Sequence, residues 1–213
     1  GLLYSAFTYF LGFRVNSGEY KLMGLAAYGN PASSEFKQFS QIIEERLVDL
    51  KPDGSLRLDL KYFTYPYGLR MLEDRKWEKL FGLKRRSPEE ALLNIHADLA
   101  LAIQRFTEKA VLRLATELKR ITGLKQICLA GGVALNGVAN GKLLKSGLFD
   151  ALCVHPAAGD AGGALGAALG AALAAHHLHF AGAKPPIAAA DGMSGALLGP
   201  AFSKDQCKRA ILR

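Results

Sequence analysis

The sequence of 213 residues has few cysteines, and this shortage excludes several classes of protein. Its three cysteines, Cys128, Cys153 and Cys207, are odd in number and widely spaced, so they form neither a disulfide framework nor a paired zinc site. Cys128 and Cys153 lie inside apolar runs, where we expect buried thiols in strands. A chain with such cysteines fits a reducing cytoplasm best.

The sequence also lacks a clear membrane segment or leader. The most apolar stretch, residues 159–175, is rich in glycine and alanine and contains Asp160, so it resembles a packed helix more than a bilayer span. Residues 1–13 are apolar, but no basic residues precede them and no small-residue cleavage site follows, so a signal peptide is not expected. The chain does not begin with methionine, and we expect it to be a fragment.

Positive charge is the main imbalance of the composition, with a formal net charge of +8. Much of the excess lies between Lys61 and Arg86, together with several aromatic residues. A basic patch can bind nucleic acid or anionic metabolites, and a solvated helical surface is the alternative. The aromatic residues cluster with Pro66 and Gly68 as in a packed loop and match no RNA-binding motif, so no nucleic-acid partner is expected.

Half of the residues are apolar, which is enough to form one core with an appended subdomain. Residues 1–13 predict a strand end followed by a short helix. Residues 34–47 have helical spacing, with Ser33 or Ser34 as the N-cap. The turn-forming residues 51–54 and the alternation that follows them predict a hairpin.

The longest predicted helix begins at Ser87, which is followed by a proline and two acidic residues, and ends at Gly123. His96 lies within this helix and is expected to be a hydrogen-bonded structural group. Three further histidines lie close together near the end of a later helix: His176, His177 and His179. Adjacent side chains on a helix point in different directions, so we expect a polar helix end and not a metal site.

The region after residue 125 repeats one plan twice. A short apolar strand at residues 126–129 precedes a double-glycine turn and a helix to about residue 144. A second strand at residues 151–154 precedes another glycine-rich turn and helix. This order predicts an α/β fold with a partly parallel sheet, and ligands bind such sheets at the carboxyl ends of the strands.

The first turn, Gly131-Gly132, combines a sharp bend with the start of a helix. Glycines let the backbone approach a ligand, and the amides at a helix start favour phosphate. Tight packing of the strand against the helix is the alternative reason for such a pair. Asn136 is expected about one turn into the helix, where its amide could reach a base or a ribose, or bond locally.

The second turn contains Asp160, the one acidic residue in residues 151–175, and Gly162-Gly163 follow it after Ala161. Its carboxylate could cap the following helix. It could also bind a metal or face a phosphate, because the two turns are expected at the same edge of the sheet. The residues leave both roles open.

Three ordered segments, residues 21–29, 128–136 and 156–166, resemble the O-carbamoyltransferase family of the NodU/CmcH type. Members carbamoylate nodulation factors and antibiotics such as cephamycins and tobramycin. The likeness runs from residue 1 to about residue 175. In the first segment, Ala27 stands where the family usually has proline.

The resemblance implies an architecture for the whole protein. Such proteins have a Kae1-like domain with the actin/sugar-kinase/Hsp70 fold, of the ribonuclease H-like class, followed by a YrdC-like domain. Residues 1–181 would be the C-terminal part of the Kae1-like domain, with a helical insertion, and residues 182–213 the linker and the start of the YrdC-like domain. Ser5 and Lys21 lie in segments that the family places near its active cleft.

The resemblance also implies a site. The nucleotide-binding glycines of the family correspond to Gly131, Gly132 and Gly162, its adenosine-side asparagine to Asn136, and its metal-binding aspartate to Asp160. The implied cofactors are ATP, as carbamoyl adenylate, and a divalent metal, iron(II). Two further ligands in a His-x-x-x-His motif precede Gly1 in the family and are not in this chain. The family's arginines for carbamoyl phosphate belong to the next domain.

The implied activity is an ATP-dependent O-carbamoyl transfer. Carbamoyl adenylate, made from carbamoyl phosphate and ATP, would pass its carbamoyl group to a hydroxyl of a small-molecule or sugar acceptor. The isolated chain is expected to be inactive, and no residue is assigned as catalytic. The alternative is an inert fragment that binds a nucleotide or a partner. The full-length protein is expected in the cytoplasm, away from membranes, and a homodimer is allowed.

Overall fold

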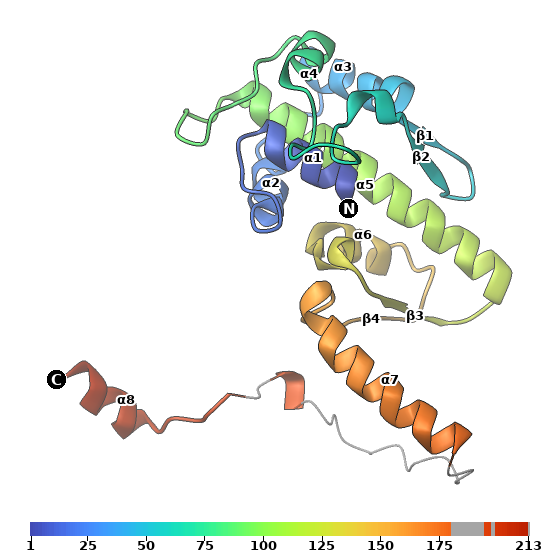
Figure 1. Cartoon of the computed structure of the whole chain (residues 1–213), viewed down its shortest axis with the longest axis vertical. Helices are drawn as coiled ribbons and strands as arrows, with labels where there is room; N and C mark the ends of the chain where they lie inside the picture. The colour runs from blue at the N-terminus through green and yellow to red at the C-terminus, as the bar shows by residue number, and fades with distance from the viewer. Residues whose placement is uncertain (180–193, 197–198, 213) are drawn as a thin grey trace. The chain divides into compact units, whose positions relative to one another are not determined.

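The computed structural model describes residues 1–179, 194–196 and 199–212 (Figure 1). The chain divides into two units, Gly1–Asp160 and Ala161–Arg213. The α-helices of the first unit are α1 (Leu2–Phe10), α2 (Glu19–Ala26), α3 (Ser34–Ile42), α4 (Asp74–Phe81), α5 (Asn94–Thr122) and α6 (Gly137–Lys145). Its strands are β1 (Val48–Leu50), β2 (Leu56–Leu58), β3 (Gln126–Leu129) and β4 (Ala151–Val154). This mixture agrees with the predicted α/β class.

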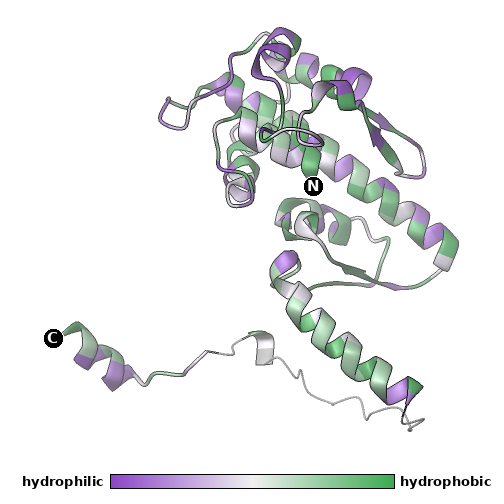
Figure 2. Cartoon of the chain, in the orientation of Figure 1, coloured by the Kyte–Doolittle hydropathy of each residue, from purple (hydrophilic) through white to green (hydrophobic). Residues whose placement is uncertain are grey.

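Helix α5 is the spine of the first unit. Helices α2, α3 and α6 pack along it, and Figure 1 shows it running from the helical part of the unit to the strands. Its first half is buried on several sides, whereas its second half alternates between apolar and polar residues (Figure 2). The predicted spine helix is therefore confirmed, although its start is not.

The start of α5 was predicted seven residues too early, because Arg86 shapes the chain before it. Arg86 is buried, and its guanidinium donates to the carbonyl oxygens of Leu11, Pro88 and Glu90. The Ser87 to Glu90 segment is a turn in which the Glu90 amide donates to the Ser87 oxygen. The capping and dipole signals at Ser87 were real local preferences, but tertiary bonds to Arg86 outweighed them.

His96 is a structural group of α5, as predicted. It is 6% exposed, and its Nδ1 accepts a hydrogen bond of 3.0 Å from the Leu93 amide just before the helix. Burial lowers the pKa of His96, and the positive charge of Arg86 lowers it further, while Glu90 opposes the shift. The folded chain therefore favours the neutral imidazole.

We expect acid to destabilise the chain through His96. Its folded pKa lies below the unfolded value of 6.5, so the unfolded state takes up the proton first as the pH falls. The free energy of unfolding should decline below about pH 6.5, with a slope of at most about 1.4 kcal/mol per pH unit from this one proton. Urea unfolding at several pH values measures this slope. His96→Gln should flatten it and the exposed His179→Gln should not; equal slopes in all three proteins would contradict the assignment.

The aromatic core lies against the first half of α5. Trp77 of α4 is fully buried, and its ring meets the rings of Phe7, Phe10, Phe63 and Phe81 at centroid distances of 4.9–5.8 Å. Its indole nitrogen donates to the Tyr62 oxygen at 2.7 Å. This cluster confirms that aromatic residues of the basic stretch belong to packed structure.

Most of the basic side chains in that stretch that bond another residue form ion pairs with acidic side chains. Arg85 bonds Asp74 at 3.0 Å, and other pairs in the region are Lys61 with Asp59 and Lys76 with Glu73. These contacts favour the solvated-surface alternative for the basic stretch. Binding of nucleic acid by it stays untested.

Two other local predictions had different outcomes. Ser33 caps α3, with its Oγ accepting from the Phe36 amide at 3.1 Å, and β1 pairs with β2 as an antiparallel hairpin. Residues 1–13, in contrast, contain helix α1 and no strand, so the predicted strand end is wrong. Small and aromatic residues in mixed order fit a helix buried on one side as well as a strand end.

Strands β3 and β4 pair in parallel, with Cys128 opposite Cys153. Ile127 lies in a small core cluster with Leu143, Phe149 and Ala115. Side chains alternate along a strand, so Cys128 faces away from this cluster, and both thiols are exposed. The expectation of buried thiols is therefore wrong, although both cysteines do lie in strands.

The second unit contains helix α7 (Gly163–Leu178) and helix α8 (Lys204–Ile211). The span Asp160–Leu178 is the one helix of the described residues that is long and apolar enough to cross a membrane, which is weak evidence by itself. No residue of α7 is buried, so its predicted packing is not observed, and Figure 2 shows apolar colour along its length. The rings of His176 and His177 meet near its end, with centroids 5.2 Å apart, although adjacent side chains were expected to point in different directions. The predicted domain boundary at residue 181 lies outside the described residues.

Candidate functional site

The two turns predicted to bind nucleotide lie side by side within the first unit. Both follow the carboxyl ends of β3 and β4, and the Gly131 amide donates to the Ala158 oxygen at 2.7 Å. A Cβ atom built on Gly159 would lie 3.9 Å from the Gly132 Cα. The parallel register therefore brings the turns together at one edge, as the pattern of strands and turns predicted.

Gly131 adopts a conformation that side chains rarely allow, with φ 98° and ψ 166°. This region of backbone space is essentially restricted to glycine. Gly132 then begins a 3-10 helix, Gly132–Leu135, whose first amides have no partner inside the helix. A Cβ on either glycine would meet no heavy atom within 4 Å, so the backbone is open on this side. Such a turn can accept a phosphate or another anion.

Asn136 is the N-cap of α6, whereas the sequence predicted it one turn inside a helix. The 3-10 helix takes up the residues between Gly132 and Asn136, which shifts the start of α6. The Asn136 side chain is 8% exposed, and its Oδ1 accepts from the Ala139 amide at 3.0 Å. Local bonding, one of the two alternatives for this residue, is therefore present in the structure.

Asn136 also exchanges two hydrogen bonds with Gln104 of α5. Its Nδ2 donates to Gln104 Oε1 at 2.9 Å, and Gln104 Nε2 donates to Asn136 Oδ1 at 3.1 Å. The Tyr4 hydroxyl of α1 donates to the same Gln104 Oε1 at 2.9 Å. Burial raises the pKa of Tyr4, a hydrogen bond with Asn136 opposes this shift, and the charges of Glu108 and Glu19 raise the pKa further, so the phenol remains neutral.

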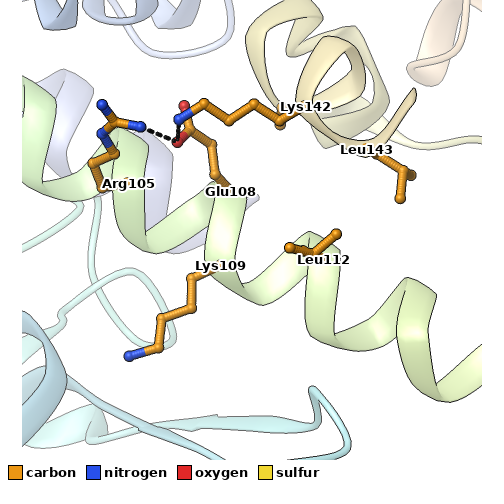
Figure 3. A pocket seen from close by; sticks show the side chains of 7 residues that line it. Arg105, Glu108, Lys109, Leu112, Lys142 and Leu143 are labelled. Carbon is orange, nitrogen blue, oxygen red and sulfur yellow. Dashed lines mark hydrogen bonds and ion pairs between the residues drawn. The ribbon is translucent and has the colours of Figure 1, made fainter. Parts of the chain in front are cut away.

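Glu108 extends this network toward the surface. Its Oε1 accepts from Gln104 Nε2 at 3.0 Å, while its Oε2 binds Lys142 of α6 and Arg105 of α5. Figure 3 shows both cations reaching the carboxylate. These residues line a pocket of about 220 Å³ between α5 and α6. The buried negative charge is therefore balanced by two cations, as buried carboxylates require.

Asp160 ends the second turn, where it begins a 3-10 helix, Asp160–Gly162. Helix α7 has Gly162 as its N-cap and no side-chain cap bond, so the capping role considered for Asp160 is absent. Asp160 is exposed, and its carboxylate makes no hydrogen bond or ion pair with the other described residues. Its carboxylate is available for a ligand.

The described residues do not form a complete metal site by themselves. No group of three or more histidine, cysteine, aspartate or glutamate side chains lies close enough in the described part of the chain to hold a metal ion. A divalent metal normally takes at least three protein ligands or several oxygens. Asp160 alone can therefore supply one ligand of the implied iron site and no more.

The first family-like segment, residues 21–29, allows α2 to pack closely against α5. A Cβ on Gly29 would lie 2.6 Å from the Ala97 oxygen, so only glycine allows this close approach. The Asn30 amide then bonds Asp98 at 2.6 Å. Lys21 is exposed on α2, and Ser5 donates to Glu19 at 2.9 Å, so the Ser5 hydroxyl joins α1 to α2.

Sequence reasoning noticed Gln104 as a member of the long helix but assigned it no role, and it missed Tyr4, Glu108 and Lys142. One signal was present. Gln104 and Glu108 are polar residues four positions apart on the side of α5 that carries buried Ala100 and Ile103. Two polar residues on a buried helical face predict a hydrogen-bonded network, because burial without partners is costly.

Sequence comparison places these features in a family. The family model described as the carbamoyltransferase N-terminus matches residues 1–169, which includes both glycine turns. The uncharacterized protein sll1178 of Synechocystis is 50% identical over 206 residues, covering 97% of this chain and 32% of that protein. The nodulation protein NolNO of Sinorhizobium fredii is 39% identical over 164 residues, covering 76% of this chain and 21% of that protein.

Nodulation protein U of Rhizobium tropici is 38% identical over 80 residues, covering 38% of this chain and 13% of that protein. The chain spans about a third or less of the length of these relatives. The region that the family model matches, residues 1–169, carries the parallel strands, the two turns and the helix α5 network. The chain therefore belongs to the carbamoyltransferase family, as part of its N-terminal region.

Proposed function

We propose that the full-length protein is an ATP-dependent O-carbamoyltransferase and that the glycine turns of this chain hold the adenylate of its carbamoyl adenylate. One observation carries this proposal. The Gly131 amide reaches the Ala158 oxygen at 2.7 Å and joins two open glycine turns at the carboxyl edge of a parallel strand pair. Ligands with phosphate groups bind at such edges. The family supplies the carbamoyl chemistry.

The transfer step needs few groups from the protein. The oxygen of the acceptor hydroxyl forms a bond to the carbamoyl carbon, the bond from that carbon to the phosphate oxygen breaks, and AMP leaves. The hydroxyl proton passes to a base or to water. AMP is a good leaving group, so the enzyme's main task is to hold the adenylate and the acceptor in register.

The proposed roles of this chain combine its geometry with the family resemblance. The amides at the start of the Gly132–Leu135 helix would face the phosphate, since they have no partner within the helix. Gly162, the N-cap of α7, would be a nucleotide-binding position by the family resemblance alone. Asn136 would lie on the adenosine side and keep its cap of α6.

Asp160 is proposed as one ligand of a divalent metal, iron(II) by the family resemblance. A metal in this position would supply a positive charge to the phosphate or the carbonyl. The remaining ligands lie outside the described residues. We also propose the actin/sugar-kinase/Hsp70 fold for the whole domain, and a cytoplasmic location, which the three free, exposed cysteines favour.

The experiment uses the full-length protein with labelled carbamoyl phosphate, ATP and a panel of sugars and aminoglycosides. We expect label to move to a sugar hydroxyl only when ATP is present, with AMP formed in equal amount. Asp160→Asn should lower both the bound iron and the transfer rate by about tenfold or more. Label transfer that does not need ATP would contradict the proposed function, and full iron content in Asp160→Asn would contradict the ligand assignment alone.

A further inference from the structure

The side chain of Gln104 has no hydrogen-bonding capacity left. Its Oε1 accepts from Tyr4 and Asn136, and its Nε2 donates to Asn136 and Glu108. The residue is 2% exposed, so water does not share these bonds. One amide thus joins α1, α5 and the N-cap of α6 in a single orientation, because a flipped amide would place donors against donors.

The orientation of Asn136 depends on this amide. Asn136 caps α6 with Oδ1 and accepts a second bond on the same atom from Gln104. The backbone nitrogen of Asn136 donates to the Val133 carbonyl oxygen at 2.9 Å, and this bond closes the 3-10 helix that begins at Gly132. A change at Gln104 would therefore move the residue that ends the glycine turn, without touching the turn itself.

We propose that Gln104 is a positioning residue of the nucleotide site, which orients the Asn136 amide and through it sets the path of the glycine turn. The inference rests on the proposed function, because it assumes that the turn holds a nucleotide. Gln104 would not touch the ligand. Its effect would appear in nucleotide affinity at temperatures where the protein remains folded.

Gln104→Glu tests this role because it makes the network depend on pH. When the introduced carboxyl group is protonated, it keeps an acceptor for Tyr4 and Asn136 and one donor for Glu108. When it is charged, it has no donor left for Glu108, and it lies beside the Glu108 carboxylate. The repulsion between the two negative charges would push it away from the Asn136 amide, which it otherwise holds through Asn136 Nδ2. The chain offers a matched control in Gln41, whose Nε2 bonds Glu45 at 2.9 Å with the same four-residue spacing but on the exposed surface.

The measurement is a titration of the full-length proteins with a fluorescent N-methylanthraniloyl ATP at about pH 5.5 and about pH 8.5, each compared with the wild type at the same pH. The relevant signal is the binding component that Gly132→Ala removes. For Gln104→Glu we expect an affinity within about threefold of wild type at the lower pH and at least about tenfold weaker at the higher pH. Gln41→Glu should match the wild type at both.

A ratio that is equal at both pH values, or the same pH effect in Gln41→Glu, would overturn the inference. If Gln104→Glu unfolds at the higher pH, Gln104→Met decides the question, because it is neutral and lacks all four bonds. It should bind about tenfold more weakly at both pH values while its thermal transition shows a folded protein; wild-type affinity in folded Gln104→Met would refute the role. If Gly132→Ala removes no binding from the wild type, the proposed function fails instead.

Discussion

Gly132→Ala should weaken nucleotide binding by about 10- to 100-fold and leave the stability of the chain nearly unchanged. The new Cβ would meet no heavy atom within 4 Å, and Gly132 has no positive φ. Alanine therefore fits at this position in the protein without bound nucleotide. The methyl group would occupy the space through which a phosphate approaches the amides of the turn. Titration with ATP and urea unfolding together separate these two effects.

Two neighbouring glycines serve as controls. Gly141→Ala lies inside α6, also in open space, and should keep nucleotide affinity while it stabilises the helix by about 0.5–1 kcal/mol. Gly131→Ala should lower stability by about 1–3 kcal/mol, since its backbone conformation excludes side chains. If Gly132→Ala binds ATP as the wild type does, the glycine turn has a structural role only and holds no nucleotide.

Trp77→Ala should cost about 3–5 kcal/mol of stability, the largest effect of any substitution considered for this chain. The indole is fully buried among four phenylalanine rings, and its removal leaves a cavity and an unpaired Tyr62 oxygen. Circular dichroism during urea unfolding measures the loss, because Trp77 is the single tryptophan of the sequence and cannot report on its own removal.

Two substitutions define the limits of that prediction. Trp77→Phe keeps an aromatic ring but removes the 2.7 Å bond to Tyr62, so we expect a smaller loss of about 1–3 kcal/mol. Tyr67→Ala, at a side chain that is 78% exposed, should change stability by less than about 0.5 kcal/mol. A loss below about 1 kcal/mol for Trp77→Ala would show that this cluster is not the core.

Sequence patterns predicted the elements that depend mainly on residues close together in the chain. The Ser33 cap, the hairpin at residues 48–58 and both strands of the parallel pair appear where the pattern placed them. Long-range bonds account for the errors. Arg86 holds three carbonyl oxygens from distant and neighbouring residues, so the Ser87 segment turns instead of starting a helix. A guanidinium that bonds carbonyls leaves no periodic signal in the sequence.

The candidate site was predictable where it depends on strand order and less so where it depends on side chains. Parallel strands with glycine turns predicted that Gly131 and Ala158 would lie at one edge. The 3-10 helix that makes Asn136 an N-cap was not predictable, because glycine and small apolar residues fit an α-helix or a 3-10 turn alike. The pairing of Gln104 with Asn136 requires the packing of α5 against α6, which no local pattern shows.

The location of the nucleotide is the central claim, and hydrogen exchange of the full-length protein with and without ATP tests it most directly. ATP should slow exchange of the amides at residues 131–136 and 158–160, where the two glycine turns meet. Gly132→Ala should abolish that protection at the same ATP concentration. Unchanged exchange in both turns, with ATP present at saturating concentration, would contradict the account.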